Sequence, residues 1–159
     1  MEDAAFDLAR EGEADGLRAR LDEGLPPDLR NARGDSLLMV AAYAGRQATA
    51  RLLLDRGADP GLANAKGQLP VVGAAYQGDA AMVALLLGHG AALDGAGADG
   101  RTALLTAALF DRAAVVELLL ARGADPRRAD AKGMTPLQAA RAMGARVTPA
   151  LIEQALGQA

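Results

Sequence analysis

The chain has 159 residues, of which 51% are hydrophobic, enough for one domain with an apolar core, and a formal net charge of −3. The absence of cysteine excludes disulfides and thiol chemistry, and the acidic balance argues against nucleic acid as a partner. Because no apolar core of signal-peptide length follows Met1 and no run approaches the roughly 18 apolar residues of a membrane span, we expect a cytoplasmic protein without a membrane partner.

The sequence repeats itself with a period of 33 residues. Glycines recur at positions 34, 67, 100 and 133, and a second glycine series falls at 24, 57, 90 and 123. Leucine triplets begin at 52, 85 and 118, and a further series runs through 12, 45, 78, 111 and 144, with aspartate in place of glycine at 111. Because four independent series agree along the whole chain, a solenoid of stacked repeats is predicted.

Within each repeat, the residue types predict two helices followed by a loop. The hydroxyls of Ser36, Thr102 and Thr135 can cap the first free amides of a helix, and alanine pairs a few residues later allow two helices to approach closely. The glycines at 45, 78 and 144 end this first helix, and each leucine triplet belongs to a second helix that ends at the next glycine. The segments that follow are rich in Asp, Asn, Pro and Gly, which predicts a hairpin that projects sideways.

In chain order, we expect five segments of one domain that covers residues 1–159. Residues 1–30 form a degenerate first repeat with nine acids against four arginines, which reads as a polar N-terminal cap. Residues 31–63, 64–96 and 97–129 are full repeats. Residues 130–159 form a C-terminal cap in which Thr148 and Pro149 begin a helix later than the period predicts. The fold class is therefore an all-α repeat solenoid whose charged caps serve solubility, and we expect a monomer.

These features resemble the ankyrin-repeat family. Residues 135–140 have the sequence TPLQAA and residues 102–108 the sequence TALLTAA, similar to the family's Thr-Pro-Leu-His-x-Ala-Ala. Leu-Leu-x-x-Gly-Ala-Asp occurs at 53–59 and 119–125, and the resemblance covers essentially the whole chain. It implies a concave groove, lined by the first helices and the hairpin tips, that binds another protein.

Three features depart from the family's pattern. The motif histidine is replaced in every repeat, by Met39, Val72, Leu105 and Gln138. The hydrogen bonds between repeats usually attributed to that histidine are therefore not expected, and apolar contacts replace them in three repeats. Leu69 stands at a helix-cap position and Asp111 at a glycine position, each at an expected cost of ~1 kcal/mol.

Two patterns suggest chemistry but are better explained by structure. Residues 95–100, GAGADG, match the dinucleotide pattern G-x-G-x-x-G, but a true fingerprint follows a buried strand and opens a helix, so we expect a hairpin tip. His89 is the single histidine and has no cysteine to complete a common zinc site, so we expect polar packing at a helix end. We predict no catalytic residues, no metal, no cofactor and no enzyme activity.

The surface assigned by the resemblance to the concave groove carries the candidate site. Three of the four aromatic residues fall there, Tyr43, Tyr76 and Phe110, and rigidly held aromatics are frequent anchors of interfaces. Equivalent or adjacent positions at the ends of the first helices contribute Gln77, Leu109 and Met143. Positions in the hairpins contribute the basic residues Arg33, Lys66, Arg101 and Lys132. The alternatives are that the tyrosines only cover their neighbours' edges and that the tip charges are simply solvated.

The sequence thus predicts a protein–protein interaction module, and its bias toward Ala, Gly and Arg suggests a bacterial source. An alternative is an immunity, inhibitor or accessory protein that sequesters or supports a specific toxin or enzyme. Nucleic-acid binding and a cryptic enzyme are less well supported, because the net charge is negative and no catalytic constellation is visible.

Overall fold

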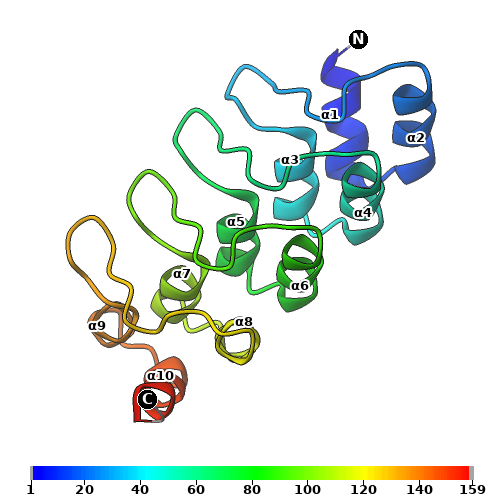
Figure 1. Cartoon of the computed structure of the whole chain (residues 1–159). Coiled ribbons are helices and arrows are strands. Elements are labelled where there is room, and N and C mark those ends of the chain that lie inside the picture. The colour runs from blue at the N-terminus through cyan, green and yellow to red at the C-terminus, as the bar shows by residue number, and fades with distance from the viewer. Residues whose placement is uncertain (1, 158–159) are drawn as a thin grey trace.

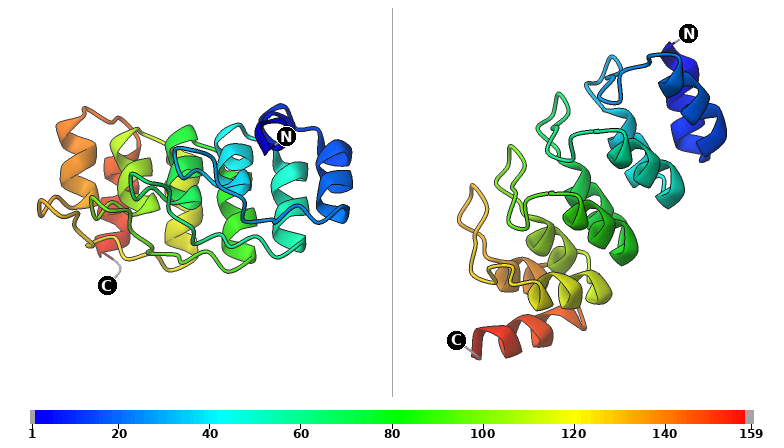
Figure 2. Two further views of the ribbon diagram at one scale, coloured as in Figure 1. Left: turned by 90° about the horizontal axis from the view of Figure 1, so that it is seen from above. Right: turned by 45° about the vertical axis from the view of Figure 1, so that its right-hand side comes forward.

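The computed structural model describes residues 2–157, and this part of the chain forms ten α-helices in one curved row of pairs (Figure 1). They are α1 (Glu2–Glu11), α2 (Ala14–Asp22), α3 (Leu37–Tyr43), α4 (Gln47–Asp55), α5 (Pro70–Gln77), α6 (Ala80–Gly88), α7 (Ala103–Leu109), α8 (Ala113–Ala121), α9 (Pro136–Ala142) and α10 (Thr148–Gly157). The odd-numbered helices form one layer and the even-numbered helices the other (Figure 2). The predicted all-α repeat solenoid is confirmed.

Hydroxyl caps begin the first helix of three repeats. Thr135 and Gln138 form a reciprocal capping box at the start of α9, in which Thr135 Oγ1 accepts from the Gln138 amide at 3.3 Å. The same first bond, at 3.1 Å, joins Ser36 to the amide of Met39 and Thr102 to the amide of Leu105. Leu69 has no side-chain oxygen, so α5 begins without such a bond.

Two threonine-to-valine substitutions are expected to change stability in opposite directions. In Thr102→Val, α7 loses its cap, which lowers the free energy of unfolding by about 1 kcal/mol. Thr49 is fully buried in α4, and its Oγ1 has no hydrogen-bond partner within the described residues. Thr49→Val removes this unpaired group without changing shape and raises the free energy of unfolding by about 1 kcal/mol. Urea unfolding measures both, and shifts of the same sign would contradict the assignment.

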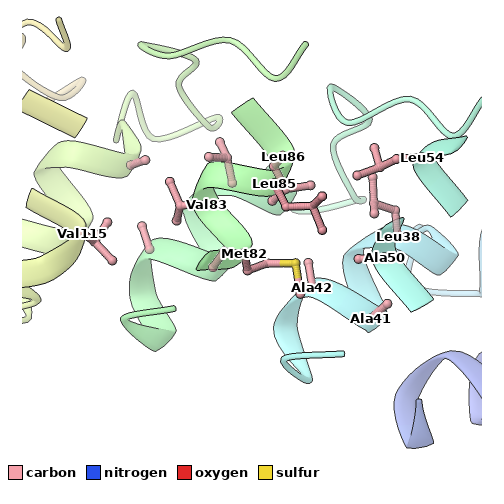
Figure 3. Packing of buried hydrophobic residues seen from close by; sticks show 14 of the residues in the cluster. Leu38, Ala41, Ala42, Ala50, Leu54, Met82, Val83, Leu85, Leu86 and Val115 are labelled. Carbon is pink, nitrogen blue, oxygen red and sulfur yellow. The ribbon is translucent and has the colours of Figure 1, made fainter. Parts of the chain in front are cut away.

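The apolar core is a continuous layer between the two rows of helices. Its alanines lie where helices approach closely, and Ala41 and Ala42 of α3 are at most 1% exposed. Figure 3 shows Met82 of α6 reaching toward Ala42, and its side chain is fully buried. Leucines from the triplets, such as Leu53 and Leu86, are also fully buried. Each repeat therefore packs only against the repeats before and after it.

Asp111 departs from the glycine series, and its side chain contacts the segment that begins α10. Its backbone adopts a positive φ of 56°, as glycine does at the equivalent positions. Its carboxylate accepts hydrogen bonds from the amides of Arg146 and Val147 at 3.0 Å and from that of Thr148 at 2.9 Å. These bonds hold the start of α10 at Thr148, later than the period predicts. The cost expected at this position is therefore accompanied by a stabilising contribution.

The stability supplied by Asp111 is expected to depend on pH. The hydrogen bonds from the Thr148, Arg146 and Val147 amides lower its pKa from 3.8 to about 2. A depressed pKa stabilises the fold above the unfolded value and loses that effect as the pH falls through the folded value. The stability difference between the wild-type chain and Asp111→Asn is therefore constant at neutral pH and shrinks as the pH falls from 3.8 to about 2. Denaturant unfolding at several pH values measures it, and a difference independent of pH would contradict the role.

The hairpin loops project from the side of the odd-numbered helices and are joined by single backbone hydrogen bonds (Figures 1 and 2). An alanine amide of each loop donates to a carbonyl of the preceding loop: Ala65 to Arg33 at 3.1 Å, Ala98 to Gly67 at 3.0 Å, and Ala131 to Asp99 at 2.9 Å. The loops therefore form a ladder that fixes their spacing along one rim of the solenoid.

Candidate functional site

Three aromatic side chains form a continuous row, which we call the aromatic row, on the layer of odd-numbered helices. Tyr43 ends α3, Tyr76 lies near the end of α5, and Phe110 follows α7. The rings of Tyr43 and Tyr76 are nearly parallel, with centroids 6.3 Å apart. Tyr76 meets Phe110 edge to face at 4.8 Å, a favourable arrangement for aromatic pairs. Tyr43 is 53% exposed and Tyr76 39%.

The aromatic row borders a groove of about 650 Å³, here called the aromatic groove, between α3, α5 and α7 and the hairpin loops. Its apolar wall consists of the row together with Met39, Leu69, Pro70 and Val72. The rim on the loop side is polar and includes Lys66, Gln68, Asp99 and Arg101. A second, more polar hollow of about 620 Å³ continues toward α1 and shares Met39, Tyr43 and Gln68 with the first. The concave side is therefore hollowed over several repeats.

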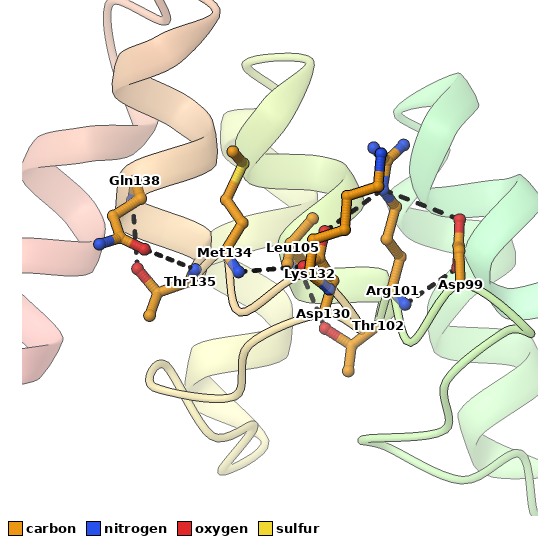
Figure 4. A network of polar contacts seen from close by, with 9 residues as sticks. All are labelled: Asp99, Arg101, Thr102, Leu105, Asp130, Lys132, Met134, Thr135 and Gln138. Carbon is orange, nitrogen blue, oxygen red and sulfur yellow. Dashed lines mark hydrogen bonds and ion pairs between the residues drawn. The ribbon is translucent and has the colours of Figure 1, made fainter.

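Charges at the rim are partly neutralised within the loops (Figure 4). Arg101 Nε lies 3.7 Å from Asp99 Oδ2 and 3.9 Å from Asp130 Oδ2. Hydrogen bonds from backbone amides, chiefly that of Met134, hold the pKa of the Asp130 carboxyl below its ordinary value. The side chain of Lys66 is exposed and makes no ion pair with any described residue. Of the two cations at the rim, Arg101 is therefore paired with carboxylates and Lys66 is not.

The sequence of the chain matches a known family of repeats. A family model described as ankyrin repeats (3 copies) matches residues 5–95, 38–130 and 73–157 in overlapping stretches. The chain belongs to the ankyrin-repeat family. A Pseudomonas aeruginosa protein named as an ankyrin repeat protein is 57% identical over 47 residues, which are 30% of this chain and 28% of that relative. The match therefore spans less than a third of the relative's length. Ankyrin repeats generally mediate protein–protein interactions.

The ankyrin fold brings together only some of the residues predicted for the site. Tyr43, Tyr76, Phe110, Lys66 and Arg101 all line the aromatic groove. Arg33 borders the second hollow, beside Tyr43. The remaining predicted residues line neither hollow: Gln77, Leu109, Met143 and Lys132. The structure therefore separates a central group of candidates from peripheral ones.

Met39, Leu69 and Val72 line the aromatic groove, although they are not among the residues predicted for the site. Met39 and Val72 occupy the motif-histidine position, and Leu69 occupies a helix-cap position. All three are half-buried. At each of these positions an apolar residue replaces a polar residue of the family motif, and the three replacements lie on one wall of the groove. The departure from the motif is thus the signal that identifies them. Leu105, at the same position as Met39, is buried beneath the surface.

Both patterns that suggested chemistry take part in structural contacts. His89 follows α6, with Nδ1 3.0 Å from the Leu85 carbonyl and Nε2 3.2 Å from Asp55 Oδ1 of the preceding repeat. Arg56 makes the equivalent contact to Asp22, at 2.6 Å, so this is a recurring link between the even-numbered helices. Residues 95–100 lie in a hairpin loop, in which the Gly97 amide donates to the Arg101 carbonyl. Both agree with the structural interpretations.

No group of three or more His, Cys, Asp or Glu side chains in residues 2–157 is arranged to hold a metal ion. None of the described helices combines the length and apolar character that crossing a membrane requires.

Proposed function

We propose that this ankyrin-repeat protein is a non-catalytic module that binds one protein partner through the aromatic groove. The observation that carries the proposal is the aromatic row: three of the chain's four aromatic residues contact one another on the concave side, and both tyrosines remain exposed. Large aromatic side chains on a rigid support provide contact area with little loss of conformational entropy. Three of the four basic candidates, Arg33, Lys66 and Arg101, border the same hollows.

The proposal includes rigid docking by a monomer in the cytoplasm. The groove lies between helices whose side chains are anchored in the core and loops joined by backbone hydrogen bonds. Binding therefore requires little backbone rearrangement. The excess of nine acids over four arginines in residues 1–30 supports the monomer, because a net like charge disfavours stacking of two copies through this repeat.

The test is a comparison of proteins captured from a lysate by the intact chain and by Tyr43→Ala/Tyr76→Ala/Phe110→Ala. We expect a protein, identified by mass spectrometry, to be retained by the first and lost by the second, and the purified pair to bind directly. Arg51→Ala/Glu117→Ala, on exposed positions of α4 and α8, is the matched control and should retain it. Circular dichroism verifies that each variant is folded. Equal retention by the aromatic variant would contradict the proposal.

A further inference from the structure

The wall of the aromatic groove accepts an apolar group. Met39 and Val72 replace the hydrogen-bonding histidine of the motif, and Leu69 replaces a hydroxyl, so this wall presents methyl, methylene and thioether groups. Thr106 also contributes to the lining, but its Oγ1 is buried and unavailable as a donor. A polar group placed against such a wall would lose its hydrogen bonds to water without replacement. The part of a partner that packs against Met39, Leu69 and Val72 is therefore an aliphatic or aromatic side chain.

Charges of both signs line the two hollows, and they balance differently in each. Asp35 Oδ1 accepts from Asn64 Nδ2 at 2.8 Å. Asp99 Oδ1 accepts from the Arg101 amide at 3.0 Å, and its other oxygen faces the Arg101 guanidinium. The side chains of Arg33 and Lys66 are exposed and make no ion pair with any described residue. The aromatic groove is lined by two cations, Lys66 and Arg101, and one carboxylate, Asp99, and therefore carries a net charge of +1. Around the second hollow, Arg10 and Arg33 are balanced by Asp3 and Asp35.

We infer that the occupant of the aromatic groove is a short segment of the partner protein in which a large apolar side chain lies next to an acidic residue. The apolar side chain packs on the aromatic row, and the carboxylate lies against the Lys66 ammonium. A groove of about 650 Å³ has the size of a small-ligand pocket, which suits a few side chains of a segment rather than a broad domain face. This inference rests on the proposed function and names the chemistry of its partner.

The two parts of the segment contribute differently. A few buried anchors, most often aromatic residues or arginine, supply most of the free energy of binding at interfaces. An exposed rim charge contributes less to affinity, but it selects partners and raises the association rate at low salt. We therefore expect the aromatic row to determine whether a segment binds and Lys66 to determine which segments are preferred.

The test selects binders from a random-peptide phage library on the full chain, with Tyr43→Ala/Tyr76→Ala/Phe110→Ala as the counter-selection target. We expect enrichment of peptides that combine Asp or Glu with an adjacent Leu, Phe, Ile or Trp. Binding of the synthesised peptides should weaken about tenfold in Lys66→Glu. Lys132→Glu is the matched control because Lys132 occupies the equivalent position of the last loop and lines neither hollow. Its effect should stay within about twofold.

Three outcomes would overturn the inference. Enrichment of apolar peptides without acids, unaffected by Lys66→Glu, would remove the role of the carboxylate and leave the proposed function standing. If Lys66→Glu and Lys132→Glu weakened peptide binding equally, or if an oligonucleotide displaced the peptides as well as a competing peptide does, the whole loop rim would attract polyanions without preference for Lys66. Failure to enrich any peptide over the aromatic variant would show that a short segment does not suffice, and the lysate comparison then decides separately whether a protein binds there.

Discussion

Replacing Gly67 by alanine is expected to lower the free energy of unfolding by about 2–4 kcal/mol. Gly67 has a φ of 74°, a conformation that costs an alanine ~1 kcal/mol. In addition, a Cβ built at this position would lie 2.3 Å from the Cβ of Ala98 in the next hairpin loop. Ala98 cannot move away easily, because its amide donates to the Gly67 carbonyl at 3.0 Å. Strain and overlap therefore add.

Gly133→Ala separates these two effects. Gly133 lies at the equivalent position of the last loop with a φ of 80°, but no atom lies within 4 Å of a Cβ built there. It should cost only the conformational part, about 1 kcal/mol. Urea unfolding of the two variants gives the difference directly. Equal losses of stability in the two variants would show that the loop of Ala98 moves away from the new methyl group at position 67 without a cost in free energy.

The same contact connects stability with the candidate site. Lys66 and Gly67 are adjacent, and both line the aromatic groove. Because each loop is joined to the next by a single backbone hydrogen bond, the position of Lys66 depends on the contact between the loops of Gly67 and Ala98. Gly67→Ala is therefore expected to disturb the rim as well as the fold, whereas Gly133→Ala leaves the groove intact.

The fold could be predicted from sequence because its determinants are local and repeated. A hydroxyl such as Thr102, a fully buried alanine such as Ala107 and a terminating glycine such as Gly123 act within a few residues of their own position. Because they recur every 33 residues, the sequence also predicts that the repeats stack on one another, which a single copy would not indicate. Packing between layers follows from this repetition, since each repeat contacts only its neighbours.

Contacts that depend on a particular side chain crossing between repeats could not be predicted in the same way. Asp111 reaches the amides that begin α10, and nothing in its local sequence indicates that its carboxylate lies within 3.0 Å of them. Met143 belongs to the predicted helix column and is 59% exposed, yet it lies outside both hollows. Leu69 shows the reverse case, a departure from a cap motif that becomes part of the groove wall. Equivalent positions in successive repeats therefore identify one side of the solenoid, but they do not predict how far a groove extends on that side.

Within the aromatic row, Tyr76→Ala is expected to have the largest effect on binding of the partner identified by capture, because Tyr76 alone contacts both other rings. Truncating such an anchor typically costs 2 kcal/mol or more, which corresponds to roughly a thirtyfold increase in Kd. The protein should remain folded, with a loss of about 1–2 kcal/mol from the two ring contacts. Isothermal titration calorimetry measures the Kd and denaturant unfolding measures stability.

Two neighbouring substitutions separate the ring from its surroundings. Tyr76→Phe keeps both ring contacts and should bind within about threefold of the wild-type chain if the ring face supplies the anchor. Gln77→Ala changes the next residue, which is exposed and lines neither hollow, and should leave the Kd unchanged. A Tyr76→Ala variant that is folded and binds as well as Gln77→Ala would assign the aromatic row a purely structural role, because its rings would then do no more than cover the edges of adjacent repeats.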